Sequence, residues 1–100
     1  MAIGGLSQEV CTSQVLTGDG VVGTSGEDTV VYCVIAKGGS AITVADLTEG
    51  TDGTGTARVD MTAAINDSAV AVFPTGLFFD GGCHLDITTT GGSVTVVYQQ

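Results

Sequence analysis

The sequence contains no tryptophan, one histidine, one proline and only two basic residues, Lys37 and Arg58. Eleven acidic residues outweigh them, so the formal net charge is −9. A surface with this charge repels phosphate backbones and anionic lipid headgroups, which makes nucleic acids and membrane surfaces poor partners. Long apolar runs are also missing, and residues 1–6 lack a basic segment followed by an apolar one. We therefore expect neither a transmembrane helix nor a signal peptide.

Cysteine is scarce as well. Cys11, Cys33 and Cys83 are odd in number, widely spaced and without a CxxC pair. A small secreted domain more often carries an even set of cysteines that form disulfides. We therefore expect reduced thiols in a protein made in a cytosol, with Cys33 and Cys83 serving as small core residues.

The residues that could carry catalysis form no motif. His84 is the only imidazole, and no nucleophile motif surrounds it, so we expect no enzymatic activity. Asp80, Cys83, His84 and Asp86 lie close in sequence and resemble a ligand set for a metal. Strand alternation, however, points Cys83 away from the face that His84 and Asp86 share. We interpret this group as a solvated strand face and expect no metal there.

The second candidate metal site is a calcium site. Asp46, Glu49 and Asp52 offer carboxylate oxygens, which calcium prefers, but they lack the spacing of a calcium-binding loop. A solvated turn is the simpler interpretation. We therefore expect the protein to need neither a metal nor a cofactor.

Valine, threonine and glycine are abundant, with 16 glycines in 100 residues. β-Branched residues suit a pleated sheet, glycine suits turns, and long helices need more Leu, Glu, Lys and Arg. The composition predicts an all-β fold, an antiparallel β-sandwich or small barrel of about seven to eight short strands. Residues 9–100 form a single β domain in this interpretation, and residues 1–8 form a flexible N-terminal arm that orders only against a partner.

Period-2 alternation and glycine-rich turns locate the strands. In chain order, the predicted strands are 9–16, 21–22, 28–37, 42–47, 56–62, 69–73, 83–90 and 94–98.

Four local features refine this prediction. Residues 28–37 contain an apolar run without a polar break, which predicts a central strand buried on both faces. Gly91-Gly92 predicts a tight hairpin in which both glycines have positive φ. Pro74 indicates that the strand before it either lies at a sheet edge or ends there, and Asn66-Asp67 favours a turn over a short helical turn within 63–67.

Leu77, Phe78 and Phe79 are three large apolar residues in a row. Successive side chains of a strand point to opposite faces, so at least one of the three must leave the core face. That residue is covered either by a loop or by another chain. Together with Ile3 and Leu6 of the arm, these residues are the predicted contacts with another copy or with a partner protein.

Four segments resemble small virion proteins of tailed bacteriophages. They are VVYCVIAKGGSAITVAD (Val30–Asp46), TGLFFDGG (Thr75–Gly82), CHLDITTT (Cys83–Thr90) and GGSVTVVYQQ (Gly91–Gln100). The resemblance implies a non-enzymatic structural protein, first of all a capsid decoration (cement) protein on the outer surface of the head. A neck, tail or fibre component is the alternative within the virion. Such proteins fold in the host cytoplasm, carry no cofactor and bind the major capsid protein or another virion protein.

The resemblance also implies homo-oligomers, often trimers, and we expect a homotrimer because a closed ring multiplies the contacts of a small subunit. A decoration subunit that binds the mature shell better than its separated parts stabilises the shell by mass action. An acidic subunit suits the outer surface because it avoids packaged DNA. Outside the virion, the alternative is a small sugar- or calcium-binding β module, although the scarcity of Trp and Tyr argues against stacking on sugars.

Overall fold

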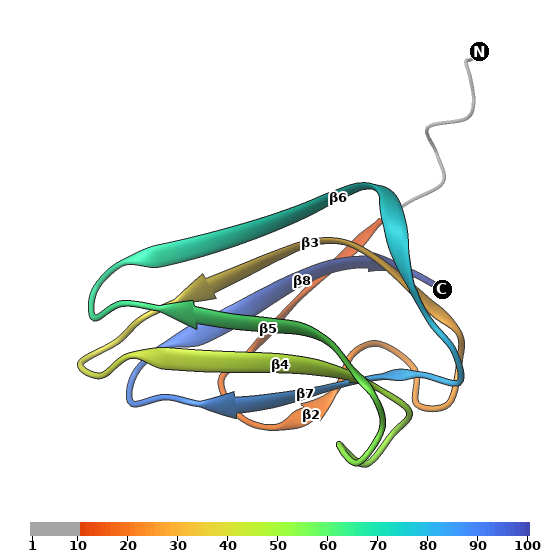
Figure 1. Cartoon of the computed structure of the whole chain (residues 1–100), viewed down its shortest axis with the longest axis horizontal. Coiled ribbons are helices and arrows are strands. Elements are labelled where there is room, and N and C mark those ends of the chain that lie inside the picture. The colour runs from red at the N-terminus through yellow and green to blue at the C-terminus, as the bar shows by residue number, and fades with distance from the viewer. Residues whose placement is uncertain (1–10) are drawn as a thin grey trace.

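Residues 11–100 are described by the computed structural model, and they form two antiparallel sheets stacked as a sandwich (Figure 1). Sheet A has the spatial order β1 (Thr12–Leu16), β8 (Ser93–Gln99), β3 (Thr29–Lys37), β6 (Ser68–Phe79). Sheet B has the order β2 (Gly20–Val21), β7 (Cys83–Thr88), β4 (Thr43–Glu49), β5 (Ala57–Ala63). The predicted all-β sandwich of short strands is confirmed. The predicted arm, with Ile3 and Leu6, lies outside the described residues.

The strand pairs show how the chain is wound. β1 pairs with β8, β2 with β7, β3 with β6 and β4 with β5, as in one long hairpin folded at the β4–β5 turn. This hairpin is then rolled up, so that β8 also pairs with β3 and β7 also pairs with β4. Eight strands in this order form a jelly roll. Apart from the β4–β5 turn, each connection between the described strands crosses from one sheet to the other.

The hairpin predicted at Gly91-Gly92 is therefore wrong. β7 belongs to sheet B and β8 to sheet A, so the connection between them turns a corner of the sandwich. Gly91 has the expected positive φ of 77°, but Gly92 does not. Instead, the Gly92 N–H donates to the Thr89 hydroxyl at 3.0 Å, and that hydroxyl lies 2.7 Å from the hydroxyl of Thr43. Threonine side chains hold this corner closed.

Two glycines allow the backbone segments at this corner to approach each other closely. A Cβ on Gly39 would collide with the backbone of Thr90, Gly91 and Gly92, and one on Gly92 would collide with the Lys37 carbonyl. The connection from β3 to β4 and the connection from β7 to β8 are thus in direct backbone contact. The Ser40 N–H donates to the Thr90 carbonyl at 2.9 Å and links the two.

The core lies between the sheets and is filled by alternate residues of each strand. Its largest fully buried side chains include Phe79, Leu47, Leu85, Val22, Val31, Val34, Val94 and Val96. Cys83 is buried among them, as predicted, and the pKa of its thiol is raised to about 12 by this burial. Cys33, in contrast, is only half-buried, so its predicted place in the core is wrong.

Other local predictions fare differently. β3 is central in sheet A, but the prediction that both its faces are buried is wrong, because Val30, Cys33 and Ile35 point outward and are half-exposed. Of the two alternatives for Pro74, the structure shows the edge: β6 is an edge strand and does not end at Pro74 but continues to Phe79. Asn66 adopts a positive φ of 55° in a turn, which confirms the turn prediction.

Candidate functional site

The outer face of sheet A carries rows of apolar side chains that run across its strands. The first row runs across strands β1, β8, β3 and β6 and consists, in that order, of Val15, Thr95, Ile35 and Val70. The second row is Ser13, Val97, Cys33 and Val72, and the third adds Val30 and Phe78. We call these apolar residues the apolar face: Val15, Val30, Cys33, Ile35, Val70, Val72, Phe78 and Val97.

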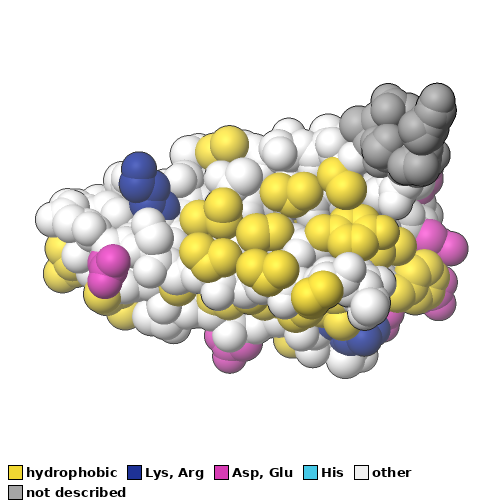
Figure 2. All heavy atoms as spheres, turned by 90° about the horizontal axis from the view of Figure 1, so that it is seen from above, with side chains coloured by type: hydrophobic (Ala, Val, Ile, Leu, Met, Phe, Trp, Pro, Cys, Tyr) yellow, Lys and Arg dark blue, Asp and Glu magenta, His cyan; other side chains and the backbone are white. Residues whose placement is uncertain are grey.

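The apolar face is open to solvent in the described chain. Val15, Val70 and Val72 are exposed by 63%, 59% and 62%, which is unusual for valine in a sheet. Figure 2 shows hydrophobic side chains gathered into a broad patch over the middle of this face, with Asp and Glu side chains outside the patch. The strands of sheet A contain no Asp or Glu, and Lys37 is their single charged residue. A patch of this kind commonly marks a surface that another protein covers.

The structure separates the three residues of the 77–79 run. Phe79 is fully buried in the core, Leu77 is half-buried against it, and Phe78 points outward with 48% of its surface exposed. At least one of the three leaves the core face, as the alternation predicted. Of the three residues proposed as contacts, Phe78 is the one with the exposure that a contact needs.

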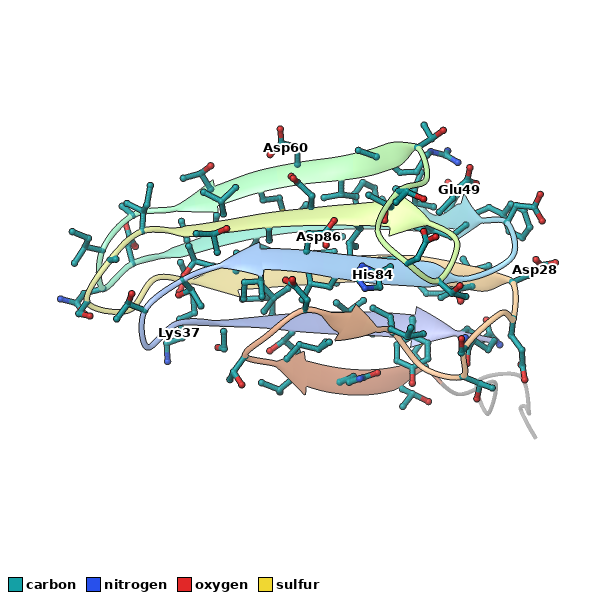
Figure 3. All side chains as sticks on the ribbon, turned by 90° about the horizontal axis from the view of Figure 1, so that it is seen from below. Asp28, Lys37, Glu49, Asp60, His84 and Asp86 are labelled. Atoms are coloured by element: carbon teal, nitrogen blue, oxygen red, sulfur yellow. The ribbon has the colours of Figure 1, made fainter. Side chains whose placement is uncertain are left out.

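The outer face of sheet B is acidic. Asp46 on β4 lies directly opposite Asp60 on β5 and directly opposite Asp86 on β7, so three carboxylates form a row across the sheet. Figure 3 shows Asp60 and Asp86 on this face. Burial and the neighbouring carboxylates, Asp60 before Asp86, raise the pKa of Asp46 above its usual value of 3.8. One oxygen of Asp46, Oδ1, is buried without a hydrogen-bond partner among the described residues.

Sequence reasoning missed this row, because Asp46, Asp60 and Asp86 are far apart in the chain. The signal would have required the strand order and the register, which place the three residues opposite one another. Like charges at directly opposite positions destabilise a sheet. The row is therefore a feature that the fold tolerates at a cost.

The two suspected metal groups do not assemble. His84 and Asp86 share a face, as predicted, with His84 Nδ1 3.5 Å from Asp86 Oδ1, while Cys83 points into the core. Within residues 11–100, no group of three or more His, Cys, Asp or Glu side chains has an arrangement that could hold a metal ion.

The three acidic residues of the candidate calcium site also do not come together, because each contacts different partners. Asp46 joins the row on sheet B, and Asp52 accepts hydrogen bonds from the N–H and hydroxyl of Thr54. Glu49 pairs with Arg58 at 3.3 Å and accepts from the Asp80 N–H at 3.0 Å. Arg58 also donates to the Phe78 carbonyl at 2.9 Å, so this cluster closes the end of the sandwich rather than forming a cation site.

No pocket opens on the described part of the chain. A helix long and apolar enough to cross a membrane is not found within it either. The candidate sites are therefore surfaces, namely the apolar face of sheet A and the acidic face of sheet B. Comparison with protein-family models, with curated proteins and with solved structures gives no match for this chain.

Proposed function

We propose that this protein is a non-enzymatic virion structural protein, and specifically a decoration protein on the outside of a tailed-phage head. The observation that carries the proposal is the segregation of its surface. An uncharged apolar face covers one sheet, and a row of aspartates lies on the other. Such a subunit gains free energy by burying one side against protein and keeping the other in water.

The jelly-roll fold is compatible with this function but is not specific to it. It occurs in viral capsid domains, and it also occurs in lectins, so the fold alone does not choose between a virion protein and a sugar-binding module. The resemblance of the strand-and-turn segments to phage virion proteins favours the first. The proposed partners are further copies of this chain and the major capsid protein.

The proposed mechanism is shell stabilisation by binding. A subunit that binds the assembled shell and not its separated parts shifts the equilibrium towards the assembled shell. Burial of apolar surface supplies the free energy, at about 25 cal/mol per Å². The acidic side faces water and stays away from packaged DNA.

Immunogold labelling of virions from the phage whose genome encodes the chain tests the function directly. We expect gold particles distributed over the outside of intact heads, and heads that lose the protein should break at lower temperature. Label confined to the neck, tail or fibres would overturn decoration in favour of the alternative virion role. A coding gene outside any phage genome, or virions without the protein, would overturn the virion function altogether.

Titration with calcium and with simple sugars tests the remaining alternative. We expect no heat of binding and no change in melting temperature. Saturable binding of either ligand by the purified protein would instead support the small β module.

A further inference from the structure

The apolar face is chemically suited to a copy of itself. Most of its side chains are β-branched and lie at regular spacing, and sheets with such faces stack about 10 Å apart with their side chains interleaved. A charged partner surface would leave its charges unpaired against these valines, at a cost. An equally uncharged sheet would not, and sheet A of a second copy is one.

Charge also favours this partner. Each copy carries a formal net charge of −9, so two copies repel each other in most orientations. With the two A sheets in contact, the acidic rows of the B sheets lie on opposite outer sides, separated by roughly 30 Å, or three sheet spacings. That separation exceeds the Debye length of about 8 Å at physiological ionic strength, so the rows are screened from each other.

The area is sufficient for a specific contact. Four strands about 4.8 Å apart and roughly 25 Å long present on the order of 500 Å² per copy, or about 1,000 Å² in a pair. Specific protein interfaces begin at about this total area. The expected contact is therefore reversible and depends on protein concentration.

The ends of β3 define the orientation. Lys37 ends β3, and Asp28 precedes its first residue, so a positive and a negative side chain lie at opposite ends of the long axis (Figure 3). Glu27 adds a second carboxylate at the Asp28 end. When two copies meet face to face about a two-fold axis with their β3 strands antiparallel, Lys37 of each copy lies towards Asp28 of the other. The symmetry makes this contact twice.

We propose that the apolar face of sheet A binds the same face of a second copy and forms a two-fold dimer with antiparallel β3 strands. The proposal does not depend on a virion function. In a decoration protein, the same face cannot bind a second copy and the shell at once, so the dimer would be the form free in solution and would dissociate when the subunit binds the shell. A three-fold ring, as expected from the sequence, would instead use two different surfaces of each copy.

Sedimentation equilibrium from low to high micromolar concentration tests the oligomeric state. We expect a monomer–dimer equilibrium for the natural sequence. Val72→Asp buries two charges in each dimer and should weaken dimerisation by at least about 100-fold. Val72→Thr keeps the branched shape and should weaken it several-fold. If Val72→Asp does not fold, as judged by circular dichroism, Val72→Thr alone decides.

Ile65→Asp is the matched control. Ile65 is as exposed as the valines, at 54%, but lies in the turn between β5 and β6 and away from the apolar face. This variant should dimerise like the natural sequence. A strict monomer at all concentrations, a trimer, or a dimer that folded Val72 variants leave intact would each overturn the proposal. A monomer that still decorates heads would overturn it while leaving the proposed function standing.

A charge reversal tests the orientation. Lys37→Asp should weaken the dimer several-fold, and adding Asp28→Lys should restore it, because the pair is re-formed with opposite signs. Asp67→Lys in place of Asp28→Lys is the control, since Asp67 lies at the Lys37 end of the sheet, where Gly38 donates to its carbonyl at 2.8 Å. Equal recovery with both partners, or recovery with neither, would overturn the antiparallel arrangement.

Discussion

Across the outer face of sheet A, Ile35 lies between Thr95 and Val70, whereas across the outer face of sheet B, Asp46 lies between Asp60 and Asp86. Both rows arise from the same alternation of inward and outward side chains, and the inner faces of both sheets are apolar. The two outer faces differ in whether contact with water is favourable. Leaving water is favourable for the valines, while the aspartates need water to screen their repulsion. The molecule thus has one side suited to burial and one side suited to exposure.

The largest expected effect is a difference in stability loss between substitutions on the inner and the outer face of sheet A. Phe79 is fully buried and its neighbour Phe78 is exposed, so Phe79→Ala should lower the free energy of unfolding by about 3–5 kcal/mol and Phe78→Ala by much less. Urea unfolding followed by circular dichroism measures both. Equal losses would mean that Phe78 is covered within the monomer and that the apolar face is smaller than described.

The next effect tests the corner of the sandwich where the connection from β3 to β4 contacts the connection from β7 to β8. Gly39→Ala places a methyl group against the backbone of Thr90 and Gly92 and should cost about 1–3 kcal/mol. Gly18→Ala is the control, because no atom lies within 4 Å of its added Cβ. Thermal melting of both variants gives the comparison. A neutral Gly39→Ala would show that the two connections are not in contact.

A smaller effect concerns the acidic row. Asp46→Asn should raise the free energy of unfolding at neutral pH by on the order of 0.2–1 kcal/mol, because it removes a like charge between two cross-strand neighbours. The pKa of Asp46 is raised in the folded protein, so protonation favours folding. The stability that the proton gives is complete below the unfolded pKa near 3.8 and is lost as the pH rises through the higher folded value.

The gain from Asp46→Asn should therefore shrink towards zero as the pH falls below the unfolded pKa. Melting curves of the natural sequence and of Asp46→Asn, from neutral pH to below the unfolded pKa, measure this gain in stability. Glu27→Gln is the control for net charge, since it removes one negative charge from an exposed loop. A gain that persists unchanged at acidic pH would contradict the electrostatic explanation.

The smallest effect leaves stability unchanged and reports exposure. In dilute folded protein, Cys33 on the apolar face should react with a thiol reagent, whereas Cys83 should be protected by burial and by its pKa of about 12. Cys11 is exposed and should react as well, and unfolding should add Cys83, so that all three thiols react because none forms a disulfide. Cys33→Ser and Cys83→Ser assign the reacting groups. Rapid reaction of Cys83 would show that the core opens readily.

Local patterns predicted much of the fold. Alternation located the strands, Pro74 indicated an edge or a boundary, and Asn66 located a turn, because each depends on residues that are close in sequence. The apolar run around Val34 was less informative. A strand with one face in a core and the other on an open apolar surface has the same sequence as a strand buried on both sides, so the exposure of Ile35 could not be read from it.

Pairing was not predictable in the same way. Period-2 alternation determines the side on which a residue lies, but not the sheet that a strand joins. Gly91-Gly92 therefore looked like a hairpin turn, although Gly92 is needed for its lack of a Cβ beside Lys37. For the same reason, the row of Asp46, Asp60 and Asp86 became apparent only with the strand order.

The position of β8 has a consequence for synthesis. β8 is the last strand of the described chain, yet it inserts between β1 and β3 and pairs residues as distant as Thr12 and Tyr98. While the ribosome still holds this segment, sheet A has an unpaired edge on β3 and valines exposed beside it. Such intermediates aggregate, and non-local pairing of this kind forms slowly. The edge of β3 that is paired in the folded protein is thus an aggregation hazard in the nascent one, and it is covered only when β8 has been synthesised.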